Sequence, residues 1–131
     1  MNILADTQIV VWSLDVNSPL SKRHREILDD TGNSVFTSYI SLMELAIKKA
    51  IGKLPGFVPN INEAADLWIK NGYEILPLTD THIFAYQSIP FFEEHRDPFD
   101  RFIIATTKEE GFTVMTADSK FQLYTSFIKV I

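Results

Sequence analysis

Short apolar segments alternate with amphipathic segments along the whole chain. Four apolar segments are rich in branched or aromatic residues and too short for typical helices, a pattern typical of strands that are covered on both faces of a sheet. We therefore predict strands over Ile3–Ala5, Ser34–Thr37, Glu74–Leu78 and Phe112–Met115. A fifth segment, Phe127–Ile131, is predicted to add an edge strand.

The segments between these strands favour helices. The clearest are Leu42–Ile51, which ends at Gly52, and Phe99–Glu110, which ends at Gly111; in both, apolar residues recur at helical spacing and glycine follows the last turn. Further helices are predicted over Lys22–Leu28, Ile61–Ile69 and His82–Ser88. Strands that alternate with helices predict an α/β sandwich around a parallel sheet, and such folds carry their sites at the carboxyl ends of the strands.

Composition and charge narrow the function classes. The chain has 131 residues, 46% of them hydrophobic and 22% charged, which suits one soluble domain over residues 1–131. It has no cysteine, which excludes disulfides, thiol nucleophiles and cysteine metal sites. No apolar run reaches the ~18 residues of a membrane span, and the N-terminus does not resemble a signal peptide, so we expect a cytoplasmic protein.

The charge balance of 12 basic against 17 acidic residues argues against a simple basic protein that binds phosphate groups. That argument weakens if some carboxylates are metal ligands. Setting four of the acids aside leaves 13, nearly equal to the 12 bases.

Acidic residues fall where the predicted strands end and where two predicted helices begin. Asp6, Asp80 and Asp118 follow three of the strands, while Glu44 and Asp100 lie near helix starts. In a parallel sheet these positions share one edge, so we expect the acids to converge there. Carboxylate oxygens are preferred ligands of Mg²⁺ and Mn²⁺, and a site of this kind can activate water against a phosphate.

Each acid also has a purely structural interpretation. The three aspartates that follow strands can be N-caps. Ser41 and Glu44 fit a capping box, and Asp97 with Asp100 fits a cap followed by an acid in the first turn. Taken together, however, several carboxylates at one edge repel one another unless a cation compensates, which favours the metal interpretation.

Four motifs carry a resemblance to a known family. They occur in the order Leu4-Ala5-Asp6-Thr7, Ser41-Leu42-Met43-Glu44-Leu45-Ala46-Ile47-Lys48, His95-Arg96-Asp97-Pro98-Phe99-Asp100-Arg101 and Thr116-Ala117-Asp118. Together they resemble the PIN-domain nucleases, most closely the VapC-like toxins of type II toxin–antitoxin pairs. The resemblance extends over nearly the whole chain. It implies a PIN-like three-layer α/β/α sandwich with a central parallel sheet of about four to five strands.

The same resemblance implies an endoribonuclease that hydrolyses RNA with water activated by Mg²⁺ or Mn²⁺, restrained by a cognate antitoxin and commonly homodimeric. The acidic quartet of the family, catalytic and metal-binding, corresponds to Asp6, Glu44, Asp100 and Asp118. Asp97 is a rival for the third place, but the spacing from Asp100 to the following helical alanine agrees with the family. Most relatives carry His where this chain has Gln8, which leaves a substrate or antitoxin contact in question.

Several neighbouring residues are secondary candidates. Thr7 and Thr116 flank two of the acids and can orient a ligand or water, or merely bond to the backbone. Lys48 lies four residues after Glu44, so it fits either an exposed helical ion pair or a phosphate contact. Arg101 can likewise contact the RNA backbone through its forked guanidinium.

Other polar and aromatic residues favour structural roles. The histidines show no metal-binding spacing and are predicted at the surface or in loops: His24, His82 and His95. Arg96 is a further candidate for a phosphate contact. Trp12 and Trp68 are predicted in the core or an interface. Phe91 and Phe92 favour anchoring a loop or facing a partner subunit over stacking on bases.

Three other functions compete with the nuclease. A catalytically inactive PIN-type binding domain is disfavoured because all four acids are present. A receiver-like signalling module would need paired acids after the first strand and a lysine after the last, where this chain has a single Asp6 and has Asp118 in place of the lysine. A haloacid dehalogenase-type phosphatase needs Asp-x-Asp, and the run Asp6-Thr7-Gln8 lacks the second aspartate.

Overall fold

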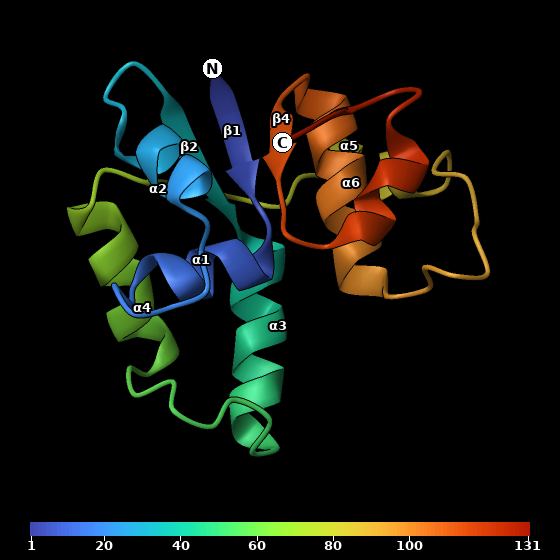
Figure 1. The fold of residues 1–131 in the computed structure, drawn as a ribbon. Helices are drawn as coiled ribbons and strands as arrows, with labels where there is room; N and C mark the ends of the chain where they lie inside the picture. The colour runs from blue at the N-terminus through green and yellow to red at the C-terminus, as the bar shows by residue number, and fades with distance from the viewer.

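The computed structural model describes residues 1–131. It shows a five-stranded parallel sheet with helices on both faces (Figure 1). The strands lie in the order β3-β2-β1-β4-β5, and every neighbouring pair is parallel. Their bounds are β1 Asn2–Ala5, β2 Ser34–Ser38, β3 Glu74–Leu76, β4 Thr113–Met115 and β5 Lys129–Val130. The predicted α/β/α sandwich and its edge strand are thereby confirmed.

Six α-helices and one 3₁₀ helix surround the sheet. They are α1 Thr7–Ser13, α2 Lys22–Asp29, α3 Tyr39–Ala50, α4 Ile61–Lys70, α5 Asp80–Tyr86, α6 Pro98–Glu110 and η1 Ser119–Tyr124. None of these helices is both long enough and apolar enough to cross a bilayer.

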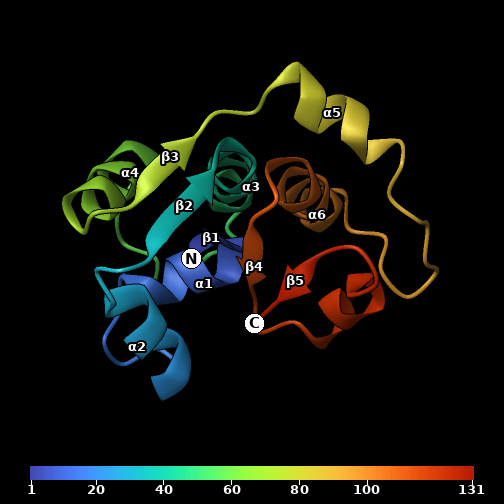
Figure 2. The ribbon, with the colours of Figure 1, turned by 90° about the horizontal axis from the view of Figure 1, so that it is seen from above.

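Alternate side chains of the strands supply two separate cores. On β1, Ile3 and Ala5 pack into the core formed with α1, α2 and α4, while Leu4 points to the opposite face and packs with α6 and η1. Figure 2, which looks along the sheet, shows α1 and α2 on one side and α5 and α6 on the other. Burial of both faces explains why the strands are apolar at nearly every position.

Local backbone chemistry explains where the elements differ from prediction. Strand β3 stops at Leu76 because Pro77 has no N–H to continue the ladder. Helix α5 begins two residues earlier than predicted, because the Thr79 hydroxyl accepts the N–H of His82. Asp80 is therefore the first residue of the helix, and the prediction that it is an N-cap is wrong.

Helix α1 was not among the predicted helices. Its sequence, Thr-Gln-Ile-Val-Val-Trp-Ser, is a branched apolar run that would equally suit a strand. Asp6 decides the outcome, because its side chain caps the first turn and ends β1.

The carboxyl ends of β1, β2 and β4 meet at one edge of the sheet. Ala5 pairs with both Thr37 and Met115, so the three strands end in register. Helices α1 and α3 leave from this edge, and α3 projects away from the sheet (Figure 1). The residues that follow these strands are thereby brought close together.

Candidate active site

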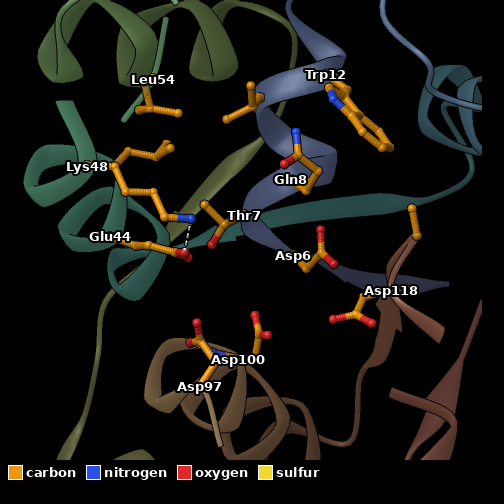
Figure 3. A pocket seen from close by; sticks show the side chains of 13 residues that line it. Asp6, Thr7, Gln8, Trp12, Glu44, Lys48, Leu54, Asp97, Asp100 and Asp118 are labelled. Atoms are coloured by element: carbon orange, nitrogen blue, oxygen red, sulfur yellow. Dashed lines mark hydrogen bonds and ion pairs between the residues drawn. The ribbon is translucent and has the colours of Figure 1, made fainter. Parts of the chain in front are cut away.

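A cleft of about 380 Å³ opens at this edge, between α1, α3, the start of α6 and the segment after β4 (Figure 3). Five acids line it: Asp6, Glu44, Asp97, Asp100 and Asp118. The expected convergence is therefore observed for the four predicted site acids and for Asp97, the alternative to Asp100. Asp80 does not join them; it is exposed and lies outside the cleft.

Asp6 is the most constrained of these acids. Its Oδ1 accepts the N–H of Ile9 at 2.8 Å, and its Oδ2 accepts the Thr116 hydroxyl. Burial raises the pKa of Asp6 from 3.8 to about 6; these two hydrogen bonds oppose the rise, and the carboxylates of Asp100 and Asp118 add to it. This buried carboxylate therefore carries an unfavourable charge that a cation would stabilise.

Glu44 lies in the middle of α3 and is not part of a capping box. The helix begins at Tyr39 with Ser38 as its N-cap, so the capping-box interpretation of Ser41 and Glu44 is wrong. Ser41 is hydrogen-bonded to the Thr7 hydroxyl instead, at 3.0 Å, and this buried bond joins α3 to α1. Thr7 thus has a side-chain partner, not the backbone bond considered above.

The carboxylate of Glu44 is only half satisfied. Its Oε2 accepts from Lys48 Nζ at 2.7 Å, whereas Oε1 is buried without any hydrogen-bond partner. Partial burial of the ammonium opposes a rise in the pKa of Lys48, but the bond to Glu44 and the nearby acids raise it above the usual lysine value. Lys48 therefore stays charged in the cleft, with nearly half of its side chain exposed.

Asp100 is held by a histidine that the sequence did not reveal. His95 is buried; its Nε2 lies 2.9 Å from Asp100 Oδ2, and its Nδ1 lies 2.9 Å from the Tyr124 hydroxyl. Tyr124 can donate to Nδ1, which leaves the proton on Nε2 to be donated to the carboxylate. Burial raises the pKa of Asp100; His95 opposes the rise, and Asp97 and Glu44 add to it.

The prediction of a surface or loop position is wrong for His82, which lies in α5. His82 is fully buried and bonds through Nε2 to Glu110 at 2.6 Å, while its Nδ1 accepts the N–H of Thr79. His95 does lie in a loop, as expected, but η1 covers it, and its ring packs against Phe121 and Tyr124.

Asp97 and Asp118 both cap helices. Asp97 is exposed and accepts the N–H groups of Phe99 and Asp100, as predicted. Asp118 accepts the N–H of Lys120 at the start of η1. In both cases the second carboxylate oxygen remains free to face the cleft.

The guanidinium of Arg101 is buried and does not face the cleft. It donates to the carbonyls of Pro90 at 2.8 Å and Ile89 at 3.1 Å, and stacks over Tyr86. The prediction of an RNA contact for Arg101 is therefore wrong, because its donors hold the loop before α6. Arg96 is exposed and paired with Glu93.

The predictions for the aromatic residues are confirmed only in part. Trp68 is in the core, where its indole donates to the Val10 carbonyl at 2.9 Å, as expected. Phe92 packs against the core below the loop, whereas Phe91 is exposed. Trp12 packs partly against the core and also lines the cleft.

The donor set of the cleft suits a hard divalent cation. Possible ligand atoms of His95, Asp100 and Asp118 lie within 4.8 Å of one another, although Nε2 of His95 is already bonded to Asp100. Asp6 and Glu44 line the same cleft but are not part of this close group. The unpartnered Oε1 of Glu44 and the raised pKa values of Asp6 and Asp100 are the features expected of carboxylates whose partner is a cation. Chemically, such an arrangement can bind Mg²⁺ or Mn²⁺ and act on a phosphate ester.

Comparisons with known proteins agree with this fold. The PIN domain family model matches residues 3–125. The structure is similar to that of VapBC2 from Rickettsia felis bound to a promoter DNA fragment, with a TM-score of 0.72 and 18% identity over 100% of this chain and 98% of that one. Comparison with curated proteins finds no match.

Two further solved structures are similar over nearly their full length. FitAcB from Neisseria gonorrhoeae gives a TM-score of 0.65 and 22% identity over 98% of this chain and 96% of that one. VapC20 from Mycobacterium tuberculosis, a toxin that cleaves the sarcin–ricin loop, gives 0.62 and 19% over 98% of both chains. At these identities the likeness establishes the fold.

Proposed function

The chain belongs to the PIN domain family, and from this premise we propose that it is a metal-dependent endoribonuclease, the toxin of a type II toxin–antitoxin pair. The observation that carries the proposal is the cleft, in which all four acids of the family quartet converge from four separate segments. RNA is the proposed substrate because one structurally similar protein, VapC20, cleaves RNA.

The proposed ligands of Mg²⁺ or Mn²⁺ are Asp6, Glu44, Asp100 and Asp118. Glu44 supports this assignment because its Oε1 is buried and has no partner in the protein. When bound, a divalent cation supplies a Lewis acid that activates water and neutralises charge on the phosphate.

The side chains around the quartet prepare it for this role. The hydrogen bond from His95 fixes the orientation of Asp100, and the Thr116 hydroxyl fixes that of Asp6. Lys48 carries the positive charge nearest to Glu44, with enough exposure to contact a phosphate. The chain thus offers oriented acceptors for a cation and, in Lys48, one partly exposed positive charge for the substrate.

We further propose a cognate antitoxin as the partner. Two of the similar structures are complexes of the VapBC and FitAB type, and in one of them the complex is bound to promoter DNA. An activity on cellular RNA under antitoxin control would act in the cytoplasm.

A homodimer is also proposed, and α3 supports it. Tyr39, Met43, Ile47 and Ile51 recur every four residues and are 45–59% exposed, so they form one apolar stripe on the helix. A second copy can cover the same stripe in an isologous contact. Ile47→Asp is expected to convert the protein from dimer to monomer in analytical ultracentrifugation; a wild-type monomer at high concentration would contradict this part of the proposal.

Cleavage of a structured RNA pool tests the function. Purified protein is incubated with Mg²⁺, with Mn²⁺ and with EDTA, and fragments are mapped by sequencing. Cutting at discrete sites that requires metal is the expected result.

A matched pair of variants separates the site from contamination and from the rival acid. Asp118→Asn and Asp97→Asn both replace an N-cap aspartate by asparagine, which still caps a helix, so both variants are expected to fold. We expect Asp118→Asn to lose at least 10²-fold in rate and Asp97→Asn to lose less than tenfold. Cutting that survives Asp118→Asn, or a metal-free wild-type activity, would overturn the proposal.

A further inference from the structure

A second groove of about 580 Å³ adjoins the acidic cleft on the side of α1 and the 53–59 loop. The two share lining residues, namely Gln8, Val11, Trp12 and Leu54, so they form one continuous surface. The cleft carries five carboxylates, whereas the second groove is lined largely by aromatic and aliphatic side chains, including Phe57. We call this second space the aromatic groove.

The polar groups at the junction are free to bind a ligand. The indole N–H of Trp12 is accessible to solvent and makes no hydrogen bond within the protein. Gln8 is exposed and makes no side-chain hydrogen bond; it lies one turn before Trp12, on the same face of α1 (Figure 3). The indole of Trp68 differs, because it is fully buried and donates to a backbone carbonyl.

A phosphodiester held at the carboxylates has a nucleoside on each side, and the aromatic groove is directly continuous with that position. The chain has a net charge of −5, so its overall charge does not favour attraction of the RNA backbone. Stacking of bases on aromatic side chains supplies affinity that does not depend on net charge. The groove offers such stacking beside the proposed reaction centre.

We propose that the aromatic groove is a nucleobase-binding subsite, in which Trp12 stacks on an unpaired base next to the scissile phosphate and the Gln8 amide bonds to the edge of that base. This inference rests on the proposed ribonuclease function and specifies its substrate class. Stacking on Trp12 requires a base that is not paired, so the preferred substrate is a single strand or a loop. A glutamine amide both donates and accepts, which suits recognition of a base edge.

Tryptophan fluorescence tests the subsite directly in the intact chain. Only two tryptophans are present, and Trp68 is fully buried, so a ligand-induced change in emission reports on Trp12. The probe is a single-stranded RNA hexamer, with Ca²⁺ in place of Mg²⁺ to limit cleavage. Its matched control is a hexamer with abasic sites at every position, which has the same backbone charge. We expect saturable quenching by the hexamer. The abasic strand should cause no quenching and should bind at least tenfold more weakly.

Variants identify the residue responsible. Binding of a 5′-labelled hexamer is followed by fluorescence anisotropy, which does not depend on tryptophan. Trp12→Leu keeps an apolar side chain against the core but cannot stack, and is expected to weaken binding about tenfold. Trp12→Phe keeps stacking and is expected to bind within about threefold of wild type. Urea unfolding of both variants checks that the fold is retained.

The possible outcomes separate this inference from the proposed function. Wild-type protein that cleaves RNA but binds both hexamers equally, with Trp12→Leu unaffected, would overturn the subsite alone and would leave the groove to a protein ligand such as an antitoxin segment. Wild-type protein that neither binds nor cleaves any RNA would overturn both proposals. Equal weakening by Trp12→Leu and Trp12→Phe would show that stacking is not the contact.

Discussion

Helix α6 has a buried histidine–carboxylate pair at each end. At its start, His95 bonds to Asp100 at 2.9 Å; at its end, His82 bonds to Glu110 at 2.6 Å. Both histidines are buried, and both carboxylates are partly exposed. The two pairs are nearly identical in chemistry, yet only one of them borders the acidic cleft.

The difference lies in what surrounds each pair. Nδ1 of His82 accepts the N–H of Thr79 and caps α5, while Nε2 bonds to Glu110 and joins α5 to α6. Glu110 faces no other acid of the cleft. Asp100 lines the cleft with Asp6, Glu44, Asp97 and Asp118. Burial raises the pKa of Asp100, and the carboxylates of Asp97 and Glu44 add to the rise. A buried histidine–carboxylate pair is therefore no sign of function by itself. The convergence of further carboxylates on the pair indicates a functional site.

The largest expected difference is in catalysis. Asp100→Asn should lower the rate of RNA cleavage by on the order of 10³-fold, because it removes a proposed metal ligand. Glu110→Gln should change the rate less than threefold, because an amide oxygen can still accept from His82. Initial rates under saturating Mn²⁺ compare the two variants. Comparable losses in both would mean that the two ends of α6 do not differ in function.

The pair of His82 and Glu110 should matter for stability and not for catalysis. His82→Ala removes a fully buried ring and leaves the Thr79 N–H without its acceptor, so we expect unfolding to become easier by about 2–4 kcal/mol. The folded fraction should cleave RNA at the wild-type rate. Urea unfolding gives the free energy; a variant with wild-type stability would show that this pair does not hold α5 to α6.

Asp6 offers a test of how the burial of a carboxylate in the cleft affects stability. Its pKa is about 6 in the folded protein and near 3.8 when unfolded, so between these values the folded state binds more protons. The stability of the metal-free protein should therefore fall as pH rises from 4 to 6 and should stay lower above pH 6. Asp6→Asn keeps the cap on Ile9 and abolishes this loss.

At pH 7.5 in EDTA, we expect Asp6→Asn to be more stable than wild type by up to about 3 kcal/mol. Urea unfolding at several pH values measures the effect. Added Mn²⁺ should stabilise the wild type more than the variant. A wild-type pH slope identical to that of Asp6→Asn would contradict the raised pKa.

The smallest expected effect concerns the histidine that orients Asp100. His95→Asn should raise the Mn²⁺ concentration that gives half-maximal cleavage by about 10- to 100-fold, the range typical of a residue that supports a metal ligand. Tyr124→Phe removes only the hydroxyl that bonds to His95, so its effect should be several-fold smaller. Wild-type Mn²⁺ dependence in both variants would show that His95 only fills space.

Much of the site could be predicted because its signals are local. Asp6 and Asp118 follow buried strands, and Asp100 follows a cap and a proline, so their place at one sheet edge needs only the parallel topology. Glu44 was predicted to lie near the start of a helix. In the structure, Ser38 caps the helix six residues before Glu44, which lies buried in the middle of the helix.

The role of His95 was not predictable because its burial depends on distant residues. The ring is enclosed by Phe121 and Tyr124 of η1, and Tyr124 lies 29 residues further along the chain. A short 3₁₀ helix has little sequence periodicity, so η1 was not predicted either. Arg101 illustrates the same limit, because its buried position is set by carbonyls of the loop that folds over it.

Direct binding of Mn²⁺ tests the central claim, that the acidic cleft is a divalent-cation site. Free Mn²⁺ is followed by electron paramagnetic resonance as it is titrated into wild type, Asp100→Asn and Glu110→Gln at pH 7.5. We predict saturable binding to wild type and to Glu110→Gln, and at least tenfold weaker binding to Asp100→Asn. Equal binding by all three proteins, or none by the wild type, would contradict the claim.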